Sequence, residues 1–165
     1  MFSFCFNFFI IFGSLPSGWK PTIEPSDPEL IIAVKQQSID DVRFFLEHKE
    51  NVDSRDKFGF SVLHWSVLVE NIEITKLLIK CGADVNAKSG GWKVTPLMNA
   101  VSRGNISLVK LLLEFGADPD YKDLKGRYAV TLTTNREIIC LLRAHMKKKE
   151  NAPIWKLILG YFLDK

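Results

Sequence analysis

Residues 75–86 read TKLLIKCGADVN and residues 109–120 read VKLLLEFGADPD, and these two stretches decide the fold. Their Gly-Ala-Asp triplets begin at Gly82 and Gly116, 34 residues apart. Apolar side chains recur before each glycine at i, i+3 and i+4, which predicts a helix closed by a glycine in the left-handed conformation. A near-copy at this separation indicates an internal repeat of the kind that builds solenoids.

The repeat extends in both directions from this pair. Two strong copies span 56–88 and 89–122, and two weaker copies span about 26–55 and 123–146. The positions that correspond across the four copies, at intervals of 33, 34 and 33 residues, are Leu30, Leu63, Leu97 and Val130. Each copy predicts a turn, a short apolar helix, a polar break and a second helix. Helices this short bury their apolar faces only against neighbouring copies, so the copies are expected to stack.

Two motifs in the strong copies resemble the ankyrin repeat. Residues 61–66, SVLHWS, and 95–100, TPLMNA, are similar to its T-P-L-H-x-A signature, and both GAD segments are similar to its ending. The resemblance implies an all-α ankyrin-repeat solenoid of about four helix-turn-helix repeats, two full and two degenerate caps, with a C-terminal helix. The departures are the loss of Thr-Pro at Ser61-Val62, the replacement of histidine by Met98, and an extra residue in the loop 89–93. The last copy is also about three residues short between its helices.

Three segments are expected along the chain: a hydrophobic N-terminal segment over 1–25, the repeat domain over 26–146, and a basic linker with an amphipathic helix over 147–165. Met1–Leu15 is apolar and rich in phenylalanine. It has three interpretations: a signal or anchor, a segment that packs or binds elsewhere, or a start site placed too far upstream. Ile154–Leu163 is interpreted as a helix that covers the last repeat or as a membrane-proximal segment, and it is too short to span a bilayer.

Composition and motifs argue against catalysis and against nucleic-acid binding. The net charge is only +3, and basic residues do not interleave with aromatic ones as a base-stacking surface requires. The three cysteines are widely spaced, which excludes paired-cysteine zinc motifs and weakly favours a reducing, cytoplasmic location. No catalytic or phosphate-binding motif occurs, so no enzyme activity, cofactor or metal site is predicted. The resemblance implies a structural role for His64, which would tie a hairpin loop to a helix, and Trp65 is expected in the core.

The resemblance also implies that another protein binds on the concave surface formed by the loop tips and the first helices. The residues expected to contact it are Lys57, Phe58, Phe60, Val69, Trp92, Arg103, Lys125 and Arg127. Neighbouring positions expected on the same surface are Leu68, Gly91, Val94, Ser102 and Leu124. This mixture of apolar and basic groups predicts a partner with apolar anchors and some negative charge. The chain is expected to be a monomer, with membrane contact left open through Met1–Leu15 or Ile154–Leu163.

The leading functional interpretation is an adaptor or scaffold module that binds a protein partner. Leu63-His64-Trp65 and the Gly-Gly loop before Thr95-Pro96-Leu97 also look like the ankyrin segment of Asp-His-His-Cys-type palmitoyltransferases. That resemblance implies a substrate-recruiting part or fragment of a membrane enzyme, although the sequence contains no Asp-His-His-Cys motif. A membrane-anchored or secreted ankyrin effector is the remaining alternative, and its basis is Met1–Leu15.

Overall fold

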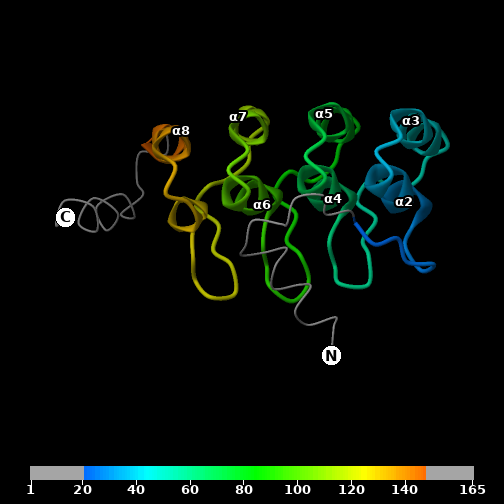
Figure 1. Ribbon diagram of the computed structural model, residues 1–165, viewed down its shortest axis with the longest axis horizontal. Helices are drawn as coiled ribbons and strands as arrows, with labels where there is room; N and C mark the ends of the chain where they lie inside the picture. The colour runs from blue at the N-terminus through cyan, green and yellow to red at the C-terminus, as the bar shows by residue number, and fades with distance from the viewer. Residues whose placement is uncertain (1–20, 148–165) are drawn as a thin grey trace.

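The computed structural model describes residues 21–147, in which helix pairs stack side by side (Figure 1). The predictions for Met1–Leu15 and for Ile154–Leu163 lie outside the described residues. The inner row of helices is α2 (Glu29–Lys35), α4 (Val62–Leu68), α6 (Pro96–Ser102) and the 3₁₀ helix η1 (Ala129–Leu132). The outer row is α3 (Ile39–Glu47), α5 (Ile72–Lys80), α7 (Ile106–Glu114) and α8 (Arg136–Lys147). Each inner helix packs against its neighbours in the row, so the predicted all-α solenoid is confirmed.

Polar residues at the helix starts set the boundaries of the helices. Asn71 accepts a hydrogen bond from the Ile74 N–H at 3.0 Å, and Thr95 accepts one from the Met98 N–H at 3.3 Å. Pro96 occupies the first turn of α6, where its missing N–H costs nothing. The polar breaks expected between the two helices of a repeat end in the N-caps Asn71 and Asn105, and each accepts a backbone N–H that has no partner within its helix.

The two end repeats differ from the central ones. Within residues 21–47, the first repeat enters α2 from Pro28 after a turn at residues 25–27 in place of a hairpin loop. In the last repeat the 3₁₀ helix η1 stands where the central repeats have an α-helix of seven residues. Because the last copy is about three residues shorter, the chain has too few residues for an α-helix of full length at this position. This is expected of a degenerate cap.

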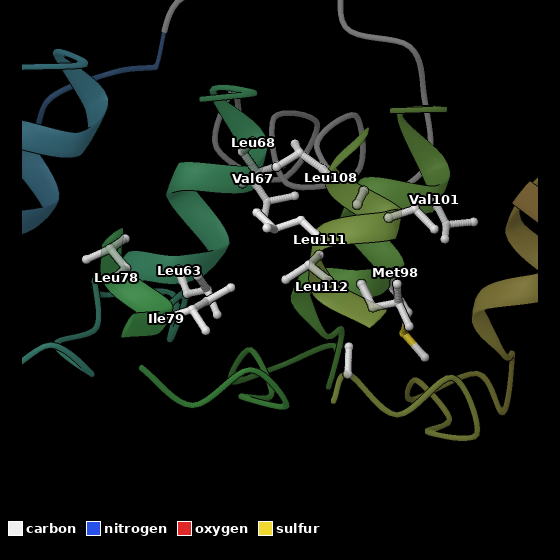
Figure 2. Close-up of a cluster of buried hydrophobic side chains, with 14 of the residues drawn as sticks. Leu63, Val67, Leu68, Leu78, Ile79, Met98, Val101, Leu108, Leu111 and Leu112 are labelled. Carbon is white, nitrogen blue, oxygen red and sulfur yellow. The ribbon is translucent and has the colours of Figure 1, made fainter. Parts of the chain in front are cut away.

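The core lies between the two rows of helices and between successive repeats. Figure 2 shows apolar side chains of α4, α5, α6 and α7 meeting there, and Leu63, Leu78, Leu108 and Leu112 are at most 1% exposed. Full burial of one such side chain stabilises the fold by about 1.5–3 kcal/mol. Apolar contacts within each helix pair and between successive repeats therefore hold the stack together.

Hairpin loops project from the inner row and pack against one another. Gly59 has φ of +80°, and a Cβ added to it would lie 2.6 Å from the Gly90 nitrogen. The Leu124 N–H donates to the Trp92 carbonyl at 2.9 Å, which joins the next two loops. These contacts hold the loop tips in a row. Within residues 21–147, no helix combines the length and the apolar composition needed to cross a membrane.

Candidate protein-binding surface

Three consecutive hairpin loops each present one large apolar side chain at the tip. Phe58 is 37% exposed and Leu124 is 58% exposed, whereas Trp92 between them is partly buried against the core. We call these three residues the apolar row. Hydrogen bonds join neighbouring loops, from Arg55 to the Lys88 carbonyl and from the Leu124 N–H to the Trp92 carbonyl. The three side chains therefore keep fixed spacings and can contact one partner together.

Lysine side chains accompany the aromatic members of the apolar row. The Lys57 Nζ lies 5.2 Å from the centre of the Phe58 ring, and the Lys125 Nζ lies 5.7 Å from the centre of the Trp92 ring. Both distances suit a cation–π interaction. Lys57 also forms an exposed ion pair with Glu24 at 3.0 Å. The tips therefore combine apolar surface with positive charge.

The hairpin aspartates Asp56 and Asp123 turn inward and bond within their own loops. Asp56 accepts from the N–H groups of Phe58 and Phe60 through Oδ1 and from Trp65 Nε1 through Oδ2, the last at 3.0 Å. Asp123 accepts backbone N–H groups in the same way, and its Oδ2 binds the Arg127 guanidinium. The two aspartates thus hold the loops in shape and do not face the tip lysines. Arg127 is paired within its own loop.

Three residues predicted for this surface lie in the core. Phe60 is 2% exposed, with its ring centre 6.1 Å from that of Trp65, and Val94 and Leu68 are 2% and 0% exposed. Their assignment to the binding surface is wrong, because the chain returns from each hairpin toward the helix layer before the inner helix begins. Phe60 and Val94 lie on this returning part of the chain, so their side chains point into the core. Leu68 belongs to the same core cluster.

The remaining predicted residues lie along the inner helices. Val69 is partly buried at the end of α4, and the Arg103 side chain is 13% exposed at the end of α6. Arg103 pairs with Glu70 of the preceding repeat at 2.6 Å. This ion pair crosses the boundary between two repeats and fixes the arginine against the inner row.

His64 joins the second repeat to the third from within the core. Its Nδ1 accepts from the Ser61 N–H at 3.1 Å, so its Nε2–H donates to the Val94 carbonyl, 2.9 Å away. Burial lowers the pKa of His64 to about 4, and the neutral ring is the form that can make both bonds. The expected tie between helix and hairpin is present, with the hairpin supplied by the next repeat.

Sequence comparison agrees with this geometry. The family model for ankyrin repeats (3 copies) matches residues 30–123. The chain belongs to the ankyrin-repeat family. A solved structure of the ankyrin repeat domain of Bcl-3 superposes with a TM-score of 0.66 at 30% identity, covering 69% of this chain and 50% of that one.

Curated relatives share the ankyrin region. Palmitoyltransferase ZDHHC13 of Homo sapiens is 33% identical over 113 residues, which are 68% of this chain and 18% of that protein. Protein phosphatase 1 regulatory subunit 27 of Mus musculus is 36% identical over 98 residues, 58% of this chain and 62% of that protein. A putative ankyrin repeat protein of Acanthamoeba polyphaga mimivirus is 32% identical over 97 residues, which are 59% of this chain and 13% of that protein. The chain spans less than two thirds of each of these relatives. As an ankyrin-repeat domain it is a protein-interaction module, in a fold that is typically non-catalytic.

A buried charge network in the first ankyrin repeat was not predicted. The Lys35 ammonium lies 2.6 Å from Asp27 Oδ2, 2.8 Å from the Thr22 carbonyl oxygen and 4.1 Å from the centre of the Trp65 ring. Both charged side chains are 2% exposed. The pair fixes the segment before α2 against the second repeat. Lys35 stands at the end of an apolar helix, where a lysine ordinarily reaches solvent, so the sequence gives no signal of this contact.

Proposed function

We propose that this ankyrin-repeat chain is an adaptor that binds another protein through its hairpin tips and inner helices. The observation that carries the proposal is the apolar row, Phe58, Trp92 and Leu124, held on loops that are bonded to one another. Aromatic side chains held in place before binding lose little conformational freedom, and they contribute much of the affinity at protein interfaces.

The charge at the tips favours a partner segment with apolar side chains and some negative charge. Lys57 and Lys125 lie over the aromatic rings, and the nearby aspartates are bonded inside the loops. A carboxylate beside an apolar anchor would meet the ammonium groups of Lys57 and Lys125, and at Lys57 it would compete with Glu24. In this proposal the chain is a non-catalytic, monomeric protein of the cytoplasm.

Affinity capture followed by mass spectrometry tests the proposal. Bait proteins are the wild type and a triple variant, Phe58→Ala with Trp92→Ala and Arg103→Ala. The matched control is Ile72→Ala with Phe115→Ala, which removes apolar side chains that are 43% and 40% exposed at the outer helices. Partners should be lost from the triple variant and retained by the control. Equal recovery by a folded triple variant would refute the proposed surface.

A second candidate function is recruitment of substrates for a palmitoyltransferase. The 33% identity to human ZDHHC13 over 113 residues supports it, and the similarity also extends to Palmitoyltransferase Hip14 of Drosophila melanogaster at 30%. The genomic sequence downstream of this chain should then encode an Asp-His-His-Cys motif in the same or an interrupted reading frame. Its absence would favour the adaptor.

A membrane-anchored or secreted effector is the remaining alternative. Fractionation of cells that express a tagged chain would then recover the chain with the membranes or in the medium.

A further inference from the structure

The first repeat exposes aromatic side chains at the N-terminal end of the helix stack. Phe44 on α3 is 53% exposed, and its ring centre lies 5.5 Å from that of Phe45 and 4.1 Å from that of His48. We call these three residues the aromatic end face. The helix α3 lies in the outer row, on the opposite side of the stack from the hairpin loops (Figure 1). The aromatic end face is therefore separate from the apolar row and from the inner helices.

In the later repeats the equivalent positions are buried. Phe44 and Phe45 follow the N-cap Ser38 by six and seven residues. At the same two distances from the N-caps of α5, α7 and α8, the partly or fully buried residues are Leu77 and Leu78, Leu111 and Leu112, and Leu141 and Leu142. Each of these helices contacts the outer helix of the repeat before it, and among the described residues no repeat precedes α3. The open end of a repeat stack is ordinarily polar, so an exposed phenylalanine there indicates an occupant.

The aromatic end face is too small for a separate protein partner. Phe44 is already about half covered, and Phe45 is partly buried. Full burial of one phenylalanine covers roughly 150–250 Å², so the uncovered apolar surface is no more than about 200 Å². A stable protein interface buries roughly 800 Å² on each partner. A segment of the same chain needs far less contact, because a short tether holds it at an effective concentration of about millimolar.

The segment Met1–Leu15 has the composition that this surface requires. It is rich in phenylalanine, and the first charged side chain of the chain is that of Lys20. Aromatic rings pack well against one another in edge-to-face pairs. The helix α3 carries three acidic residues and one basic residue, which are Asp40, Asp41, Glu47 and Arg43. An anionic membrane would be repelled by this helix, whereas an uncharged segment would not.

The chain before the first repeat can also reach the aromatic end face. Pro21 lines the same cleft as Gln37, which directly precedes the N-cap of α3. Phe44 lies seven residues beyond Gln37, a distance of about 10 Å along a helix. Residues 16–20 span up to about 17 Å when they are extended. Leu15 can therefore lie against Phe44 without any change in the described residues.

We propose that Met1–Leu15 docks on the aromatic end face and caps the first repeat with its phenylalanine side chains. The segment is then part of the folded domain, and it is neither a signal nor a membrane anchor. This inference goes beyond the adaptor function and does not depend on it. The docked segment covers only the outer helix of the first repeat, so the hairpin tips and the inner helices stay open to a partner.

A spin label on the segment locates it in the intact chain. Cys81→Ser and Cys140→Ser remove two exposed thiols, so a nitroxide attaches only to Cys5 within the segment. The amide signals of Phe44 and its neighbours on α3 should be strongly broadened in the ¹⁵N-labelled chain, and that of Leu142 at the other end of the stack should be unchanged. No broadening on α3, or broadening confined to the hairpin loops or the inner helices, would overturn the proposal.

A substitution within the aromatic end face tests the contact itself. Phe44→Lys should abolish the broadening of the α3 signals, because an ammonium group replaces the exposed ring. Phe115→Lys is the matched control at another exposed phenylalanine of the outer row, 40% exposed, and it should retain the broadening. Deletion of residues 2–15 should lower the Tm of the wild type and should leave that of Phe44→Lys unchanged. Retained broadening in Phe44→Lys, or an equal decrease in Tm in both backgrounds, would contradict the docking.

Two further samples examine the other possible occupants. In a mixture of spin-labelled ¹⁴N chain with unlabelled ¹⁵N chain, the α3 signals should stay sharp, and broadening there would assign the face to a second copy instead. The chain should also remain in the supernatant when vesicles of phosphatidylcholine and phosphatidylserine are sedimented. Sedimentation with the vesicles that requires residues 2–15 would identify the segment as a membrane anchor and overturn the proposal. Circular dichroism checks that each variant is folded.

Discussion

Acidification should weaken the fold through His64. The ring is fully buried, and its pKa falls from 6.5 to about 4 in the folded chain because burial disfavours the charged form. The unfolded chain therefore takes up a proton near pH 6.5 while the folded chain does not. Stability rises with pH wherever the unfolded state binds more protons, so this contribution is complete above about pH 6.5 and is lost as the pH falls toward 4.

The size of the effect follows from the shift. A difference of one pKa unit corresponds to about 1.4 kcal/mol, so a decrease from pH 7 to pH 4.5 should cost roughly 2–3 kcal/mol through His64 alone. That is a large part of the roughly 5–15 kcal/mol of a small domain. His64→Gln removes the titrating ring, so its stability should be lower at pH 7 but should change less with pH.

Urea unfolding followed by circular dichroism at several pH values measures this difference. The free energy of unfolding of the wild type should fall between pH 6.5 and 4.5 by roughly 2–3 kcal/mol more than that of His64→Gln. The exposed His48 provides the control, because His48→Gln should retain the wild-type pH dependence. Identical pH profiles of the wild type and His64→Gln would refute the assignment of the effect to His64.

Two further substitutions test other parts of the structure. Asp27→Ala should lower the free energy of unfolding by roughly 3–5 kcal/mol, because it leaves the Lys35 ammonium buried without its partner, and a loss below about 1 kcal/mol in urea unfolding would contradict the burial of this pair. Gly59→Ala should destabilise more than Gly82→Ala: both have positive φ, but only at Gly59 would the new Cβ meet the Gly90 backbone, at 2.6 Å. Equal losses of thermal stability in these two variants would show that the hairpins do not approach so closely.

The sequence predicts the repeats well because their signals are local. Helix periodicity before Gly82 and Gly116, and caps such as Asn71, act through neighbours within a few residues. The shortened last copy correctly predicted a degenerate end, where η1 replaces an α-helix. Because each local signal occurs once in every repeat, the repeat length can be recognised from this one sequence, without comparison to related proteins.

The binding surface was predictable only in part, because exposure depends on contacts between repeats. Phe58 and Phe60 are two residues apart and of one type, yet Phe58 is 37% exposed and Phe60 is 2% exposed. The difference arises from the Asp56 turn and from packing against Trp65, which position alone does not reveal. The Lys35–Asp27 pair escaped prediction for the same reason, since the Trp65 ring that covers the lysine belongs to another repeat.

The central claim, that the hairpin tips bind a protein partner, is tested most directly by an affinity measurement. Calorimetry would compare a partner identified by capture against the wild type, against Phe58→Ala with Trp92→Ala and Leu124→Ala, and against the outer-helix control, Ile72→Ala with Phe115→Ala. Loss of the apolar row should weaken binding at least about tenfold, which corresponds to about 1.4 kcal/mol, while the control retains the wild-type affinity. Unchanged affinity in the folded triple variant, or an equal loss in the control, would contradict the claim.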